Sequence, residues 1–319
     1  MADAPSAHTA PHVPANPWPH RLALVTCAAT FILILFGGLV TGLGAGLAVP
    51  DWPSTFGHNM FLFPPTKMVG GIFYEHTHRL IGSLAGLSTA SLAVALWLWE
   101  RRRWLRWLGT AALLTIIGQG VLGGLRVVWL SDNLAMVHGI VAQSFFALVA
   151  GLAVVTAKAW HRAEPCPHQG ALGAIQRWAL LTAGTAYLQV VFGAVLTHTG
   201  SRLDAHLTFA AALSALVVLL ARRVLAEAGR WPRLAQAARA LHAVWGLQLL
   251  LGAAAYVVRF QPGGVAVGLA AELAVRVAHR LTGALVLAAA VAVAAWACRL
   301  RGAAAPAESD DGVPGRVAA

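Results

Sequence analysis

Residues 75–82 read Glu75-His76-Thr77-His78-Arg79-Leu80-Ile81-Gly82 and stand at the start of a long apolar segment. The order His-Arg-Leu-x-Gly returns near the other end of the chain, at His279-Arg280-Leu281-Thr282-Gly283, where another apolar segment begins. A second repeat joins residues 118–124 to residues 189–194 and 248–253. Chance similarity among segments rich in Ala, Leu and Gly is the alternative, but it does not readily produce the His-Arg-Leu-x-Gly match. The repeats predict a chain built from two related halves.

The composition is typical of a membrane protein. Of the 319 residues, 58% are hydrophobic and only 11% are charged, and the mean hydropathy is +0.69. A soluble globular protein carries about twice that share of charge. A helix needs about 20 apolar residues to cross a bilayer. The segments that qualify are 23–48, 73–97, 108–128, 134–157, 177–198, 205–224, 240–258 and 276–298. We therefore predict an all-α membrane protein whose eight transmembrane helices form two pseudo-symmetric four-helix bundles.

The net charge of +11 follows the topology of a membrane protein, and it does not indicate a nucleic-acid interface. Of the 23 Lys and Arg residues, sixteen fall in the two tails and in the loops 100–107, 158–177 and 222–239. Basic residues accumulate on the cytoplasmic side of a membrane. An even number of spans also places both termini on one side. We predict a multi-pass protein of the plasma membrane with both termini in the cytoplasm, in contact with lipid and not with nucleic acid.

The segments outside the spans divide the chain further. Residues 1–20 lack the basic region of a signal peptide and are predicted to form a disordered tail. Residues 21–158 are predicted to form the N-terminal four-helix half, residues 159–176 a cytoplasmic linker, and residues 177–300 the C-terminal four-helix half. Residues 301–319 are predicted to form a second flexible tail.

Four histidines are predicted to lie inside the membrane at a common depth. His78, His138, His206 and His279 each stand near the start of an even-numbered span, and these spans all run from the outside to the inside. Histidine within a membrane segment is costly and usually functional. Each half then holds two histidines at matching depth on different helices, which suits two axial imidazoles on one haem iron. The alternative is hydrogen bonding between helices without a metal.

Other residues at this level are candidate contacts of a large flat ligand. Glycines of the first and third spans either leave room for a porphyrin or permit close helix packing. Arginines there are either partners of haem propionates or interfacial groups that extend to water. These arginines are Arg79, Arg126, Arg202 and Arg280. By contrast, His58, His76 and His198 lack a counterpart in the other half and are predicted to be loop or interface residues.

Glu75 precedes His78 by three residues, so the two side chains lie on one face of a helix. A carboxylate at the edge of a haem is poorly solvated and suited to accepting a proton or holding a water during oxidation of a porphyrin substituent. The second half has Arg276 at the equivalent position. This asymmetry predicts one catalytic half and one half that carries electrons. The alternative is an interfacial carboxylate that faces water.

Together these residues make the chain resemble the haem A synthase family over nearly all eight spans. The motifs are Gly-Leu-Ala-Val-Pro-Asp-Trp-Pro at 46–53, Glu75-x-x-His78-Arg79, His138 with Ala142-Gln143, Asp204-Ala205-His206 and residues 279–283. Members of that family convert haem O to haem A by oxidising a porphyrin methyl group to a formyl group. The resemblance implies that Glu75 is the catalytic carboxylate. It also implies that His78 and His138 flank the substrate haem, and that His206 and His279 ligate a haem b.

The first outer loop departs from the family pattern. Many relatives carry Cys-Pro-Asp-Trp-Pro-x-Cys, whereas this chain has Val49 and Thr55 at the two cysteine positions, so an electron route through a thiol pair is absent. The sequence leaves open the electron acceptor, a homo-oligomeric state, and whether the haem O synthase hands over the substrate. Two other functions also stay open. One is a di-haem b-type electron carrier, linked to quinol, that does not modify haem. The other is a transporter or assembly factor without haem.

Overall fold

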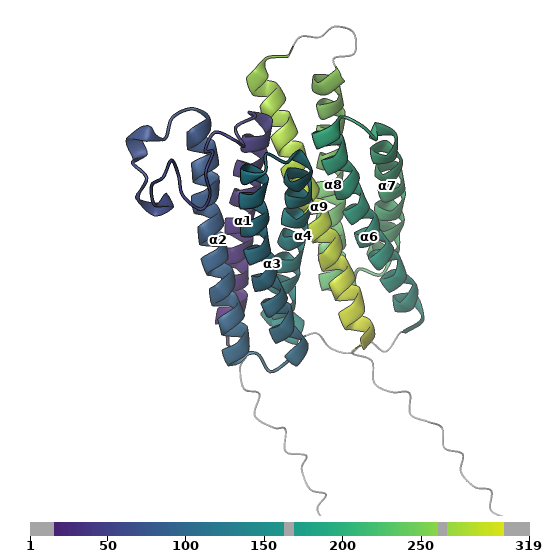
Figure 1. The fold of residues 1–319 in the computed structure, drawn as a ribbon. Coiled ribbons are helices and arrows are strands. Elements are labelled where there is room, and N and C mark those ends of the chain that lie inside the picture. The colour runs from purple at the N-terminus through teal and green to yellow at the C-terminus, as the bar shows by residue number, and fades with distance from the viewer. Residues whose placement is uncertain (1–15, 163–168, 261–266, 303–319) are drawn as a thin grey trace, which may run out of the picture. The chain divides into compact units, whose positions relative to one another are not determined.

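The computed structural model describes residues 16–162, 169–260 and 267–302. In this part of the chain the long elements are all helices, shown in chain order in Figure 1. They are α1 (Trp18–Gly42), α2 (Gly71–Trp99), α3 (Arg103–Val128), α4 (Asp132–Thr156), α6 (Gln169–Thr199), α7 (Leu203–Ala226), α8 (Pro232–Phe260) and α9 (Leu269–Gly302). The short elements are α5 (Lys158–His161), η1 (Met60–Leu62) and η2 (Pro65–Lys67).

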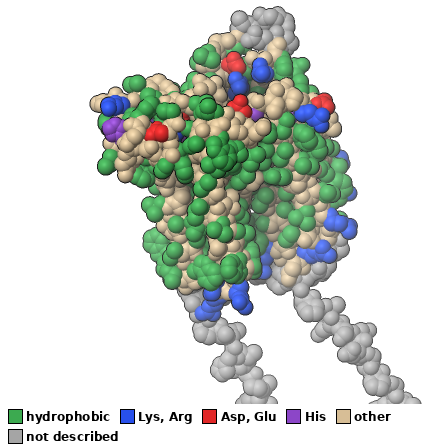
Figure 2. All heavy atoms as spheres, in the orientation of Figure 1, with side chains coloured by type: hydrophobic (Ala, Val, Ile, Leu, Met, Phe, Trp, Pro, Cys, Tyr) green, Lys and Arg blue, Asp and Glu red, His purple; other side chains and the backbone are tan. Residues whose placement is uncertain are grey.

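The prediction of eight transmembrane helices is confirmed. Within the described ranges, eight helices are long and apolar enough to cross a membrane. Large apolar side chains cover their outer faces. On α2, for example, Leu84, Leu87 and Val94 are each more than half exposed. Figure 2 shows hydrophobic side chains along the sides of the helices and charged side chains mostly toward the helix ends. Such continuous apolar surface is stable in lipid and not in water, so the chain is a multi-pass membrane protein.

Several helix ends differ from the predicted boundaries. The first helix begins at Trp18, inside the predicted tail, and ends at Gly42, well before the predicted end of the first span. Gly44 has a φ of +63°, a left-handed conformation that glycine adopts without strain and that ends the helix. Helix α6 begins at Gln169, inside the predicted linker. The remaining parts of the two tails and the linker, residues 1–15, 163–168 and 303–319, lie outside the described residues.

The chain divides into two compact units, and each is described by itself. The first unit comprises Met1–His161 with Leu269–Val277, and the second comprises Arg162–Gly268 with Ala278–Ala319. The boundary near residue 161 falls close to the predicted linker. Whether the two units are pseudo-symmetric four-helix bundles stays a prediction.

In the first unit, four helices close a ring. Helix α1 packs against α2 and α4, and α3 packs against the same two helices. Leu96, Leu105 and Phe145, from three different helices, are buried in this unit. Gly109 lets α3 approach α2 closely, because a Cβ at this position would lie 2.5 Å from Leu96 Cδ1. The ring places α2 and α4 diagonally opposite each other.

The second unit contains α6, α7, α8 and the part of α9 that begins at Ala278. Helix α7 packs against both α6 and α8. Fully buried leucines come from three of these helices: Leu172 from α6, Leu220 from α7, and Leu234 and Leu241 from α8. In lipid, the close van der Waals packing of such side chains holds neighbouring helices together.

The loop between α1 and α2 is held by the carboxylate of Asp51. Its Oδ1 accepts a hydrogen bond from the Phe56 amide (2.7 Å), and its Oδ2 accepts from Ser54 Oγ (2.5 Å) and from the Gly57 amide (2.9 Å). Burial raises the pKa of Asp51, but the hydrogen bonds from Gly57, Ser54 and Phe56 outweigh it and lower the pKa to about 2. The ionised carboxylate is therefore the form that orders this turn.

We expect the turn to survive mild acid. Because the folded pKa of Asp51 lies below its ordinary value of 3.8, its contribution to stability is complete above that value and is lost only as the pH falls through about 2. Hydrogen–deuterium exchange at the Phe56 and Gly57 amides should stay slow at pH 5. Asp51→Ala should speed it about tenfold or more after correction for intrinsic rates, since hydrogen bonds to a charged group are stronger than neutral ones. Equal protection in the variant would contradict this role.

Candidate functional site

His78 and His138 face each other within the first unit. His78 lies near the start of α2. His138 lies near the start of α4, which begins after Ser131 because the Ser131 Oγ accepts a hydrogen bond from the Leu134 amide (3.3 Å). Since α2 and α4 are diagonal in the ring, side chains on their inner faces point toward each other. The two imidazole centroids are 6.3 Å apart, with an interplanar angle of 70°. The structure thus brings the first predicted pair together.

The second predicted pair is also brought together, by α7 and α9. The centroids of His206 and His279 are 6.4 Å apart, and the interplanar angle is 79°. His206 lies in the first turn of α7, after Arg202, whose φ of +65° marks the point where the chain turns into that helix. Both histidines belong to the second unit. Each unit therefore contains one pair of facing imidazoles.

Both separations are those of two imidazoles that share one metal ion. A nitrogen lies about 1.1 Å from the centre of a five-membered ring whose bonds are about 1.33 Å long. Bonds from histidine nitrogen to a metal are about 2.0–2.1 Å. Two imidazoles on opposite sides of one ion therefore have centroids about 6.3 Å apart, by the same bond lengths. The observed 6.3 Å and 6.4 Å match this distance.

Two histidines alone do not complete the coordination of a metal. Among the residues with described placement, no cluster of three or more His, Cys, Asp and Glu side chains comes together to hold an ion. An iron between either pair would need four further ligands, which is what a porphyrin supplies. The donor set of each pair therefore fits a haem with two axial imidazoles better than a free metal ion.

Each imidazole packs against a glycine on the preceding long helix. A Cβ added at any of these glycines would lie only 3.1–3.2 Å from the imidazole Cε1. The contacts are Gly37 with His78, Gly123 with His138, Gly193 with His206 and Gly252 with His279. The Nδ1 atoms of all four histidines are buried without a hydrogen-bond partner. Buried nitrogens of this kind are rare unless a ligand or metal engages the ring. The sequence repeat contained three of these glycines, Gly123, Gly193 and Gly252, but it did not reveal their contact with the histidines.

We expect Gly252→Ala to weaken binding at the second pair. The added methyl would meet His279 Cε1 at 3.2 Å, so the ring must shift by a few tenths of an ångström. Haem content, measured as pyridine haemochrome per protein, should fall severalfold at this pair. Gly246→Ala on the same helix is the matched control, because nothing lies within 4 Å of its Cβ position. Equal haem content in the two variants would argue against the steric role of Gly252.

Glu75 lies in a buried cluster and does not face water. Its side chain is 5% exposed, and its Oε1 forms an ion pair with Arg79 Nη2 at 2.8 Å. Its Oε2 accepts a hydrogen bond from the Val49 amide at 2.9 Å. Arg79 Nη2 also donates to Val49 O (3.0 Å), while Nη1 donates to the carbonyls of Asp51 (2.7 Å) and Ser54 (3.1 Å). The alternative of an interfacial Glu75 is therefore wrong.

His76 is not the loop or interface residue that the sequence analysis predicted. It is 1% exposed and its Nδ1 lies 3.2 Å from Thr55 Oγ1, and its ring is 5.1 Å from that of Phe63. In the sequence, the burial of His76 was indicated only by its position directly after Glu75. Thr55 and Val49, which stand where many relatives have cysteines, are both fully buried. Hydrogen bonds to His76 and Glu75 thus hold this loop in place without a thiol pair.

The remaining arginines have different surroundings. Arg126 Nη2 donates to Gly46 O at 2.6 Å, and its Nε is buried without a partner. Arg276, at the position equivalent to Glu75, forms an ion pair with Glu272 at 3.0 Å. Arg280 follows His279 on α9 and has partners of its own. Of the candidate propionate contacts in the first unit, Arg126 has the buried donor, whereas the terminal nitrogens of Arg79 are engaged by protein.

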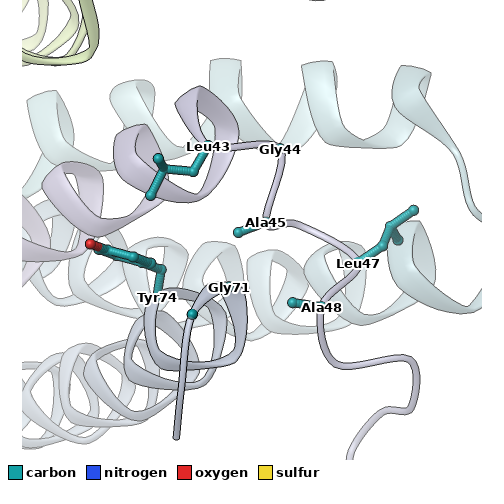
Figure 3. Close-up of a pocket in the computed structure, with 8 residues that line it drawn as sticks. Leu43, Gly44, Ala45, Leu47, Ala48, Gly71 and Tyr74 are labelled. Carbon is teal, nitrogen blue, oxygen red and sulfur yellow. The ribbon is translucent and has the colours of Figure 1, made fainter. Parts of the chain in front are cut away.

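A cavity of about 490 Å³ opens where the loop between α1 and α2 meets α2. Figure 3 shows Tyr74 and Gly71 of α2 on one side, with the segment from Leu43 to Ala48 opposite. The lining is apolar apart from the Tyr74 hydroxyl and backbone atoms. Tyr74 directly precedes Glu75, but none of the four paired histidines lines the cavity. It is therefore separate from the space between the imidazoles.

The fold and the paired imidazoles define a multi-pass, all-helical membrane protein with two bis-histidine sites. A family model described as cytochrome oxidase assembly protein matches residues 20–313. The chain belongs to this family, which includes the haem A synthases.

Individual relatives are similar over part of their length. The heme A synthase of Shouchella clausii is 28% identical over 191 residues, which cover 57% of this chain and 60% of the relative. That of Alkalihalophilus pseudofirmus is 33% identical over 133 residues, covering 40% and 43%. That of Lysinibacillus sphaericus is 27% identical over 186 residues, covering 56% and 58%. The chain thus spans about half the length of the curated relatives that it matches.

Proposed function

We propose that the protein is a haem A synthase, which oxidises a methyl group of haem O to the formyl group of haem A. The observation that carries the proposal is the pair of facing imidazoles in each unit, at the separation that one iron requires. The family membership and the relatives named heme A synthase support it. In the first unit, α2 carries both His78 and the buried carboxylate of Glu75. A simple electron carrier does not need such a carboxylate.

The reaction balances as two hydroxylations followed by dehydration. Each hydroxylation breaks one C–H bond of the methyl carbon and forms one C–O bond with oxygen from water, releasing two protons and two electrons. The resulting geminal diol loses one water to give the formyl group. Four electrons leave in all, and we propose an acceptor of the membrane quinone class for them.

The residues of the first unit hold and orient the substrate in this proposal. His78 and His138 would ligate the iron of haem O, and Arg126 Nε, which has no hydrogen-bond partner, would be available to a propionate. The protons released from the methyl carbon and the water are accepted at Glu75, whose carboxylate is oriented by Arg79 and the Val49 amide. The ordered outer loop excludes bulk water from this carboxylate.

The residues of the second unit hold the resident cofactor. His206 and His279 would ligate haem b, and Arg280 is the candidate partner for its propionates. When bound, this haem would supply one-electron transfer. We further propose that both termini lie in the cytoplasm and that a haem O synthase delivers the substrate.

The test is a pigment analysis of the purified protein. Expressed in a host that makes haem O but no haem A, the protein should contain haem b and yield haem A on extraction and chromatography. Haem b without any formyl haem would instead indicate a di-haem electron carrier. A preparation with no Soret absorption would refute both functions.

A further inference from the structure

The cavity where the loop between α1 and α2 meets α2 lies on the helix face that carries His78. Gly71, Tyr74 and His78 are spaced i, i+3 and i+7 along α2, so these positions fall on one face of that helix. Tyr74 precedes His78 by four residues, which is about 6 Å along the axis at about 1.5 Å per residue. The cavity therefore begins about one helical turn from the level of His78, toward the start of α2.

Helix α1 joins the same two places. Its Gly37 lies against the His78 imidazole, since a Cβ there would be 3.1 Å from Cε1. Leu43, at the C-terminal end of α1, lines the cavity. The two helices pack against each other, and all these residues belong to the first unit. The cavity is thus a second space beside the first imidazole pair. Because it is separate from the space between the rings, it suits a substituent of a bound haem and not the porphyrin itself.

The lining suits a long apolar chain that carries one polar group. The volume of about 490 Å³ falls within the range of pockets that bind small molecules. Of the eight described lining residues, five are glycine or alanine, and the Tyr74 hydroxyl is the only polar side-chain group. In Figure 3 the Tyr74 ring lies below the Leu43 side chain, and Ala45 points toward the space between them. No residue in the described part of the chain forms a hydrogen bond with the Tyr74 hydroxyl.

The chemistry of the lining separates two membrane ligands. Reduction of a quinone takes up two protons, and the described lining has no charged side chain to supply them. Haem O, by contrast, carries a substituent with one hydroxyl next to the porphyrin, followed by a long isoprenoid chain. Haem b has only a vinyl group at that position. One hydroxyl at the entrance of an apolar space is what the substituent of haem O requires.

We propose that this cavity holds the hydroxyl-bearing isoprenoid chain of haem O, and that Tyr74 is a specificity-determining residue that forms a hydrogen bond with the hydroxyl of that chain. The inference rests on the proposed function, because it concerns the substrate of the first imidazole pair. The cavity then selects haem O over haem b for the site beside Glu75. A site that forms hydrogen bonds with a substrate hydroxyl rejects an analogue without it, because its own polar group is left unpaired.

Competition between the two haems tests this assignment. Protein from a host that makes haem b but no haem O is equilibrated in nanodiscs with mixtures of both haems, and the bound haems are extracted and separated by chromatography. Haem A formed during the incubation is counted with haem O. Leu43→Trp, which fills the cavity, should lower the selectivity for haem O about 5- to 100-fold, the usual cost of overpacking. Tyr74→Phe should lower it about 3- to 10-fold through the loss of one hydrogen bond. Total bound haem should stay unchanged in both variants.

The same two changes made elsewhere are the matched controls. Leu24→Trp lies on α1 outside the cavity, at a side chain that is 50% exposed, and Tyr187→Phe lies on α6 of the second unit. Both should keep the selectivity of the parent protein. No preference for haem O in the parent, or unchanged selectivity in Leu43→Trp and Tyr74→Phe, would overturn the inference alone. A parent protein that binds neither haem would overturn the proposed function and the inference with it.

Discussion

Glu75→Gln is expected to abolish haem A formation while leaving haem binding intact. The amide keeps one acceptor oxygen, for either the Val49 amide or Arg79, and it does not accept a proton. The hydrogen bonds from Arg79 to the loop carbonyls remain and should keep the loop in place. General base catalysis typically contributes about 10²- to 10⁴-fold to a rate, and we expect a loss of that size. The measurement is the ratio of haem A to haem O extracted from cells that express the variant.

The chain contains a matched control for this substitution. Glu272 and Arg276 form the same i,i+4 ion pair on α9, but their side chains are 26% and 34% exposed. Glu272→Gln should therefore leave haem A formation unchanged. Undiminished haem A in Glu75→Gln would rule out the catalytic role of the carboxylate, and equal losses in both variants would point to a general effect on assembly.

His279→Ala is expected to remove the haem of the second unit. The imidazole is one of the two facing rings of this pair, and the centroid of its partner, His206, lies 6.4 Å away. Bound haem should fall from two equivalents to one, and the remaining spectrum should be that of the first pair. His206→Ala should reproduce the loss. His242→Ala is the control, since this exposed histidine of α8 lies beside Trp245 and outside both pairs. Full haem content in His279→Ala would contradict the assignment of the second pair.

The loop between α1 and α2 is held in place without cysteines at the two positions where many relatives carry them. Val49 and Thr55 are buried at the two positions, and each contacts a residue of α2: the Val49 amide contacts Glu75 and the Thr55 hydroxyl contacts His76. Arg79 and Arg126 add hydrogen bonds to loop carbonyls. The loop is therefore fixed to the start of α2 by hydrogen bonds, which do not depend on the redox state of the surroundings.

The spans and the histidine pairs were accessible from sequence for different reasons. The length of an apolar segment is enough to predict a membrane helix, so all eight were found. Some observed helix ends differ from the predicted ones: α1 ends before Gly44, and α6 begins earlier than the hydropathy pattern indicates. The four histidines stood out because a polar residue at a common depth of several spans is rare. His76 was wrongly predicted to be a loop or interface residue. The loop between α1 and α2 folds over it, and the hydropathy pattern does not show how that loop folds.

The sequence by itself determined the class of protein and its eight helices. It also picked out Glu75 and the four histidines as candidate site residues, because a polar residue in a membrane span is costly and therefore stands out in the sequence. Only the tertiary structure decided that the imidazoles face each other at 6.3 Å and 6.4 Å and that Arg79 donates hydrogen bonds to the loop between α1 and α2. Those relations join residues on different helices, and the direction in which a side chain points across a helix bundle depends on how the helices pack.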